Sequence, residues 1–153
     1  LIAEYAKRSN TKAFIQTLTT ILPYFVLFYL AIESLKISYW LTAGITLILT
    51  FFVIRVFVML HDCGHNCLYV NPRENKIVGF IFGVLCGVPQ HVWSKHHDYH
   101  HSTNGNWEKY RGPLAVLSVD QYADLDEKGK KAYANNRNLR MAPIAGFLYF
   151  IFN

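Results

Sequence analysis

The sequence predicts an all-α protein whose helices form a multi-pass transmembrane bundle. Three observations lead to this prediction. Of the 153 residues, 52% are hydrophobic and only 16% are charged, whereas about a quarter of the residues in a soluble domain are charged. Two long segments contain almost no charge, and most Lys and Arg residues lie outside them. The same composition excludes a disordered chain, a collagen-like repeat and a small disulfide-rich domain.

The two apolar segments are predicted to be membrane helices at about residues 13–32 and 38–60. The first has 20 uncharged residues, which as a helix extend about 30 Å, the thickness of a bilayer core. Pro23 would kink this helix, which membrane proteins tolerate. We expect the two helices to form a tight hairpin and Arg55 to snorkel toward the headgroups. The alternative, a pair of buried helices in a soluble protein, is disfavoured by the length of these segments.

The distribution of positive charge predicts the orientation of the hairpin. Lys7, Arg8 and Lys12 precede the first segment, ten Lys and Arg residues follow the second, and only Lys36 lies between them. The positive-inside rule therefore places both flanks in the cytoplasm. This accounts for much of the net charge of +5 through contact with the lipid bilayer, and we expect no nucleic-acid partner.

The rest of the chain divides into three predicted segments. Residues 77–92 are apolar, with glycines at every fourth position that suit close helix packing, and they are interrupted at Pro89. Residues 93–140 are polar and are predicted to be cytoplasmic, with one or two helices at about 120–134 and candidate caps at Ser118 and Asp120. A further membrane helix is expected to begin at 141–153. The regularly spaced glycines of residues 77–92 are Gly79, Gly83 and Gly87.

Both ends of the sequence bear on domain organisation. The chain begins at Leu1 without a methionine and stops at Asn153, inside an apolar run. We expect it to be part of a longer protein. Its three cysteines form no CxxC pair, which disfavours a disulfide framework and excludes a zinc ribbon.

All seven histidines lie between positions 61 and 101, and most of them form two groups. On a helix, an i,i+4 pair lies on one face, and so does an i,i+3,i+4 triplet. Neutral imidazoles in such rows suit iron, zinc, copper and nickel, and they have no evident packing role because each ring carries polar nitrogens. The predicted metal ligands are His61, His65, His97, His100 and His101.

A single metal site constrains the topology. If both histidine groups serve the same metal site, they must lie on the same side of the membrane. A segment between them that crossed the bilayer would separate them by about 30 Å. We therefore predict that residues 77–92 enter the membrane or lie along its surface and return without crossing it.

Several neighbours of the histidines have weaker assignments. His96 points about 100° away from His97 on a helix, and His91 is expected to be structural. Asp62 is expected to orient a histidine, and Asn104 and Asn106 to hydrogen-bond ligands or metal-bound water.

Small and aromatic residues near the histidines are assigned packing roles. Gly64 suits a close backbone approach, and Cys63 is expected to be there because it is small. The aromatic residues Tyr39, Trp40 and Trp93 are expected at the membrane interface.

The string HDCGH at 61–65, followed by WSKHHDYHHSTNGNWEKYRG from Trp93, resembles the first two histidine boxes of membrane fatty acid desaturases. The similarity is closest to the acyl-lipid, methyl-end branch, which includes delta-12 and omega-3 enzymes. In the first box, H-D-x-x-H corresponds to His61, Asp62 and His65. In the second, H-x-x-H-H corresponds to His97, His100 and His101. The resemblance covers about residues 20–150, so 1–153 is interpreted as a partial desaturase domain.

The resemblance implies an integral membrane oxidoreductase of a bacterial inner membrane, the endoplasmic reticulum or a plastid. Such enzymes hold two non-haem iron ions mainly by histidines, and use dioxygen and two electrons to remove two hydrogens from an acyl chain. The implied substrate is an acyl lipid or acyl thioester, and the implied electron donor is cytochrome b5 or ferredoxin. The family's third box, H-x-x-H-H, has no counterpart after His101. We therefore expect the isolated chain to be inactive.

Three other functions fit parts of the pattern. A related di-iron hydroxylase, ketolase or acetylenase would share the histidine spacing. A membrane zinc hydrolase would use a motif similar to HExxH, but Asp62 replaces the glutamate and has a shorter reach. A haem anchor would need two histidines inside the bilayer, whereas these lie at its edge. The bound metal distinguishes the three.

Overall fold

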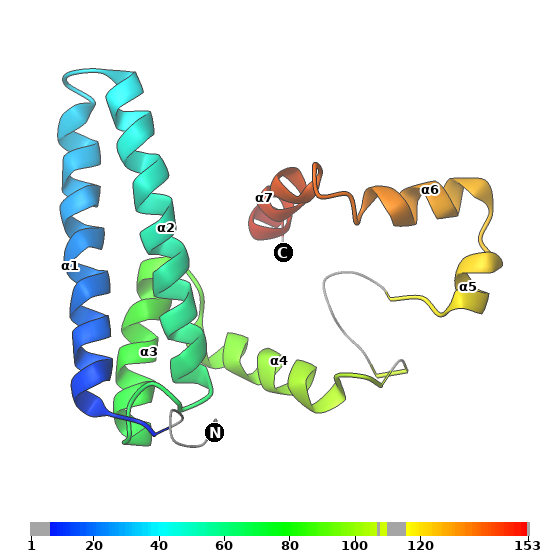
Figure 1. Cartoon of the computed structure of the whole chain (residues 1–153), viewed down its shortest axis with the longest axis horizontal. Helices are drawn as coiled ribbons and strands as arrows, with labels where there is room; N and C mark the ends of the chain where they lie inside the picture. The colour runs from blue at the N-terminus through cyan, green and yellow to red at the C-terminus, as the bar shows by residue number, and fades with distance from the viewer. Residues whose placement is uncertain (1–6, 107, 110–115, 153) are drawn as a thin grey trace. The chain divides into compact units, whose positions relative to one another are not determined.

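The computed structural model describes residues 7–106, 108–109 and 116–152. Within these ranges all regular structure is helical, as predicted. Seven helices follow one another along the chain (Figure 1): α1 Asn10–Ser34, α2 Tyr39–Gly64, α3 Pro72–Cys86, α4 Gln90–Thr103, α5 Val119–Ala123, α6 Glu127–Asn135 and α7 Ala142–Phe152.

The chain divides into two compact units, residues 1–99 and 100–153. The division falls between Tyr99 and His100, inside the continuous helix α4. The first unit holds the two long helices and α3, and the second holds the short helices α5–α7.

Helices α1 and α2 form the expected hairpin (Figure 1). Both are long and apolar enough to cross a membrane, with 25 and 26 residues. Their turn is closed by a hydrogen bond between the hydroxyl oxygens of Ser34 and Thr42, at 2.8 Å. Pro23 lies inside the continuous α1. Helix α2 extends beyond the expected residue 60 to Gly64, and this extension makes His61 helical.

Hydroxyl groups join the two long helices. Thr20 is fully buried, and its hydroxyl lies 2.6 Å from the Gln16 carbonyl and 3.2 Å from the Met59 sulfur. Arg55 donates a hydrogen bond from Nη2 to the Thr19 hydroxyl at 3.3 Å. Where little hydrophobic force brings helices together in lipid, such contacts help to set their packing. Arg55, which we expected to snorkel, thus also has a partner on α1.

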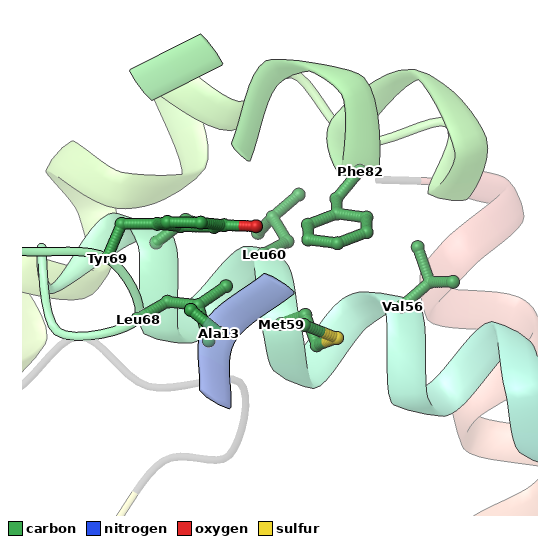
Figure 2. Packing of buried hydrophobic residues seen from close by; sticks show 8 residues of the cluster. Ala13, Val56, Met59, Leu60, Leu68, Tyr69 and Phe82 are labelled. Carbon is green, nitrogen blue, oxygen red and sulfur yellow. The ribbon is translucent and has the colours of Figure 1, made fainter. Parts of the chain in front are cut away.

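The buried core lies at the C-terminal end of α2. Figure 2 shows side chains from three helices and the α2–α3 link meeting in one cluster. Its centre is formed by Leu60, which is fully buried, as are Val56 beside it and Phe82 of α3. This core fixes the last turns of α2, which carry the first histidines. The buried members are Ala13, Val56, Met59, Leu60, Cys63, Leu68, Tyr69 and Phe82.

Asn75 of α3 holds the link that follows α2. Its side chain is fully buried. The amide oxygen accepts from the Tyr69 backbone N–H at 2.9 Å, and the amide nitrogen donates to the Tyr69 carbonyl at 2.8 Å. The Tyr69 hydroxyl also lies 2.9 Å from the hydroxyl of Thr17 on α1. The link is therefore fastened both to α3 and to α1.

Helices α3 and α4 meet at a 102° bend, so together they are a broken span or a re-entrant loop. Gly87 ends α3 with a left-handed φ of +67°, a conformation that favours glycine. At Gly83 a Cβ would lie 2.6 Å from the Val88 carbonyl oxygen, and at Gly79 a Cβ would lie 2.9 Å from the Cys63 Cβ. The predicted glycine pattern thus serves two purposes: Gly79 packs on α2, whereas Gly83 and Gly87 form the bend.

Two short helices, α5 and α6, lie in the second unit where one or two were expected at about residues 120–134. Ser118 caps α5 in a capping box with Gln121. Asp126 caps α6, and its carboxylate accepts from the Gly129 N–H at 2.7 Å. Asp120, expected as a cap, lies in the first turn of α5 instead, where its negative charge interacts favourably with the helix dipole.

Candidate metal centre

The first two predicted ligands lie at the end of α2. His61 is in the last turn of the helix and His65 is its C-cap residue. Their ring centroids are 4.6 Å apart, as expected for residues about 40° apart around a helix. Both rings are half-buried.

Helix α4 brings a third histidine to this pair. The His97 ring lies 4.7 Å from the His61 ring and 4.9 Å from the His65 ring, centroid to centroid. The approach of α4 depends on Gly64, where a Cβ would lie 2.9 Å from the Ser94 hydroxyl oxygen. The close approach that the sequence suggested at Gly64 is therefore present.

The structure groups four histidines that offer ring nitrogens to one region. Each of these histidines offers one ring nitrogen, and the four nitrogens all lie within 4.8 Å of one another. The four residues are His61, His65, His97 and His101. His101 is one turn beyond His97 on the same continuous helix, and it is exposed. The two histidine boxes, 32 residues apart at their nearest ligands (97 minus 65), thus meet in space.

The fifth predicted ligand, His100, is not part of this group. On a helix it lies about 60° from His97 on the side opposite to His101, and its ring meets the His101 ring at 5.8 Å. Its role as a ligand remains a prediction. His91 and His96 are also outside the group, and both are exposed.

Asp62 contacts the histidine next to it. Nδ1–H of His61 donates to the Asp62 carboxylate at 3.1 Å. Because this bond holds the proton on Nδ1, the Nε2 lone pair of His61 is left for a metal ion. The arrangement supports the orienting role expected for Asp62.

The asparagines after the second box make a local turn. The Asn106 side-chain oxygen accepts from the backbone N–H groups of Glu108 and Lys109, at 3.1 and 3.2 Å. Asn104 is exposed. Their expected contacts with ligands or metal-bound water remain predictions.

Trp93 lies against the histidines, and its expected place at the membrane interface remains a prediction. Its ring stacks on the His97 ring, with 4.6 Å between centroids and 18° between planes. It also meets the His61 ring at 5.7 Å and the Phe57 ring at 5.3 Å. The i,i+4 spacing of Trp93 and His97 is the sequence signal that could have indicated this contact.

Cys67, close to the first box, is held as a thiol. Partial burial raises the pKa of Cys67, and the nearby carboxylate of Asp62 raises it further. The thiol donates to the Asp62 carbonyl oxygen at 3.2 Å. The group of side chains that could hold a metal ion contains histidines and not Cys67, so the donor set of this site is imidazole.

The four imidazoles fit a transition-metal ion. Imidazole nitrogens bind Zn²⁺ at about 2.0–2.1 Å, so two of them on one ion lie up to about 4 Å apart. The observed separations, within 4.8 Å, are close to this spacing before any ion draws the rings together. Imidazole suits iron, zinc, copper and nickel alike, so the donors indicate a metal centre without selecting the element.

Comparison with known proteins identifies the family. The model of the family described as "Fatty acid desaturase" matches residues 38–151, a range that contains both histidine boxes. The chain belongs to the fatty acid desaturase family. The resemblance read from the histidine boxes is thereby confirmed.

Curated desaturases from several organisms are similar to this family member. A "Fatty acid desaturase" of Bacillus subtilis (strain 168) is 36% identical over 149 residues, which are 97% of this chain and 42% of that protein. The "sn-2 acyl-lipid omega-3 desaturase (ferredoxin), chloroplastic" of Arabidopsis thaliana is 37% identical over 70 residues, 46% of this chain and 14% of that protein. A "Delta(12) fatty acid desaturase" of Mortierella alpina is 31% identical over 72 residues, 47% of this chain and 16% of that protein.

The chain therefore spans less than half the length of these relatives. No solved structure matches it significantly.

Proposed function

We propose that this chain is the part of a membrane fatty acid desaturase that supplies the first two histidine boxes to an iron centre. The observation that supports this proposal most directly is that four histidines come together in a chain of this family. They are His61, His65, His97 and His101. His100 is proposed as a further ligand on the basis of the motif. The expected centre contains two iron ions, and the remaining ligands would come from outside this chain.

The chemistry assigned to the bound iron is the oxidation of an unactivated acyl chain. Dioxygen takes up the two hydrogens of a –CH2–CH2– unit together with two electrons and two protons, giving –CH=CH– and two waters. The protein residues supply ligands, orientation and a dry environment. Asp62 keeps the proton of His61 on Nδ1, and the buried core that includes Leu60 holds the last turns of α2, which carry His61.

The apolar hairpin supports an acyl-chain substrate. Helices α1 and α2 are apolar enough to cross a bilayer, and the α2 histidines lie at one end of this hairpin. An acyl lipid or thioester dissolved in the bilayer can therefore approach the site from the lipid. The two electrons would come from a protein donor such as ferredoxin, which the name of the Arabidopsis relative contains, or cytochrome b5.

The position of Asp62 argues against a zinc hydrolase. A general base in that mechanism must face the metal-bound water, whereas the Asp62 carboxylate is bonded to His61. A related hydroxylase, ketolase or acetylenase would use the same ligands and is distinguished by its product.

The decisive experiment uses the complete protein that contains this chain. Expressed in a host that lacks the corresponding unsaturated fatty acids, it should generate a new double bond, detected by mass spectrometry of the lipids, and the purified protein should contain iron. His97→Ala should abolish both. A purified protein that contains zinc without iron, or a hydroxylated product, would overturn the proposal.

The proposed topology places both histidine groups on the cytoplasmic side and keeps α3–α4 from crossing. The ring nitrogens of the α2 and α4 histidines lie within 4.8 Å of one another, which supports this topology; the 102° bend by itself also fits a broken span. In a background with the native cysteines replaced by serine, Val70→Cys and Ser102→Cys, at two exposed positions, should react with an impermeant thiol reagent from the same side of a sealed membrane. Labelling from opposite sides would refute this topology.

A further inference from the structure

Trp93 lies between the two helices that carry the histidines. Its ring stacks on the His97 ring of its own helix, and meets the His61 ring of α2 at an angle of 61°. On the α2 side it also contacts the Phe57 ring, edge to face, at 78°. Trp93 is half-buried. One indole therefore touches one candidate ligand from each histidine box.

The backbone of α2 leaves room for this indole. A Cβ at Gly64 would lie 3.3 Å from the Trp93 Cζ3 atom, closer than ordinary van der Waals contact. Gly64 is the residue before His65, so the contact lies directly beside the ligands. The environment differs from that of Trp40, which is 87% exposed near the other end of α2.

We propose that Trp93 is a positioning residue of the metal centre, whose indole holds the imidazoles of His61 and His97 in the orientation that binds metal. The inference rests on the proposed function, because the orientation of the rings matters only if they bind a metal ion. The torsion that rotates an imidazole is broad and weakly restricted by itself. The Asp62 carboxylate restricts His61 from one side, and the indole contacts both rings.

The geometry explains why an aromatic ring is needed here. Stacked and edge-to-face arrangements are preferred by planar rings, and Trp93 makes one of each with the two imidazoles. A leucine is closer in size to phenylalanine than to tryptophan, but it has no planar face and so does not favour a particular ring plane. Metal affinity should therefore depend on the aromatic face and not only on its volume.

The test measures Co²⁺ binding to the complete, metal-depleted protein. Trp93→Leu should weaken binding by about tenfold or more and shift the visible Co²⁺ absorption bands, as changes to residues that orient ligands do. Trp93→Phe, which keeps an aromatic face, should stay within about threefold of the unaltered protein. Trp40→Leu is the matched control and should change neither quantity. Circular dichroism establishes that each variant is folded.

Four outcomes separate the possibilities. A folded Trp93→Leu with unchanged affinity and spectrum would overturn the role of Trp93 and leave the proposed function intact. Equal losses in Trp93→Phe and Trp93→Leu would also overturn it, because the aromatic face would then not be the cause. Absence of both iron and Co²⁺ binding in the unaltered protein would overturn the proposed function together with this inference. Loss in Trp93→Leu with retention in Trp93→Phe supports the inference.

A second measurement needs no destabilised variant. The fluorescence that the unaltered protein has and Trp93→Phe lacks belongs to Trp93. Bound Co²⁺ should quench this component in step with binding, because the indole stacks on a metal-binding ring. Undiminished emission at full occupancy would show that Trp93 does not face the ligands and would overturn its role even if Trp93→Leu cannot fold.

Discussion

The end of α2 and helix α4 both carry histidines, but they are held in place differently. The last turns of α2 contain Val56, Met59, Leu60 and Cys63, all buried. Among the 14 residues of α4 only Thr103 is buried. Helix α2 is thus fixed by a core along several turns, whereas α4 depends on a few contacts near its beginning. One half of the candidate site is therefore built into the scaffold, whereas the other half depends on close local packing.

The largest expected effect is the loss of a ligand from the scaffold half. His61→Ala should reduce metal affinity by more than about a hundredfold, above the effect of altering a residue that only orients a ligand. His96→Ala is the control, because His96 is exposed and outside the group. The iron content and the Co²⁺ affinity are measured in the complete protein for both variants. Equal losses in the two variants would show that the grouping of rings is incorrect.

The next effect concerns the orientation of the α2 ligand. Asp62→Asn removes the charged acceptor of the His61 Nδ1–H bond, and should weaken metal binding by about tenfold to a hundredfold. Asp98→Asn, at an exposed position beside His97, should have little effect. If Asp62→Asn and Asp98→Asn lower the Co²⁺ affinity by the same factor, Asp62 does not orient the His61 ring for metal binding.

A smaller effect is expected at the bend that positions α4. In Gly83→Ala the new Cβ would meet the Val88 carbonyl oxygen at 2.6 Å, and we expect a loss of about 1–2 kcal/mol in the free energy of unfolding. In Gly44→Ala the Cβ meets nothing within 4 Å, so the better helix propensity of alanine should stabilise α2 by up to about 1 kcal/mol. Denaturant unfolding in detergent measures the free energy of unfolding of both variants. Changes of the same sign would contradict the assigned role of Gly83.

The smallest effect tests the fastening of the α2 end to α1. Tyr69→Phe removes the hydroxyl that lies 2.9 Å from the Thr17 hydroxyl, and should cost about 1 kcal/mol of unfolding free energy. Tyr29→Phe, in the exposed part of α1, should change it very little. Metal affinity should be nearly unchanged in both variants, because the core still holds α2. A large loss of metal in Tyr69→Phe would show that this core is less rigid than proposed.

The long helices could be predicted because their signal is local. An uncharged run of bilayer length predicts a helix whatever surrounds it, and α1 and α2 were found within a few residues of their expected ends. The extension of α2 to Gly64 was harder to foresee, because His61–Gly64 are polar or small, and their contacts are with other helices: Cys63 lies against Gly79 of α3, and Gly64 against Ser94 of α4.

The site was predicted less completely than the helices. The periodicity of each box showed which rings share a helix face, but it could not show how far α4 is rotated toward α2. That rotation includes His101 in the group and leaves out His100. It also turns Trp93 toward His61 of α2, a contact that its residue type did not indicate.

The sequence was enough to predict the two long apolar helices, the two histidine boxes and imidazole as the candidate metal ligand, since these depend on residue type and on spacing along one helix. Only the tertiary structure decided which histidines meet, because residues 61–65 and 97–101 belong to different helices. They are brought together by the 102° bend between α3 and α4 and by the close approach of Ser94 to Gly64, which has no side chain. The contacts of Gly64 with Ser94 and of Trp93 with His61 join segments that are distant along the chain, and no local pattern records them.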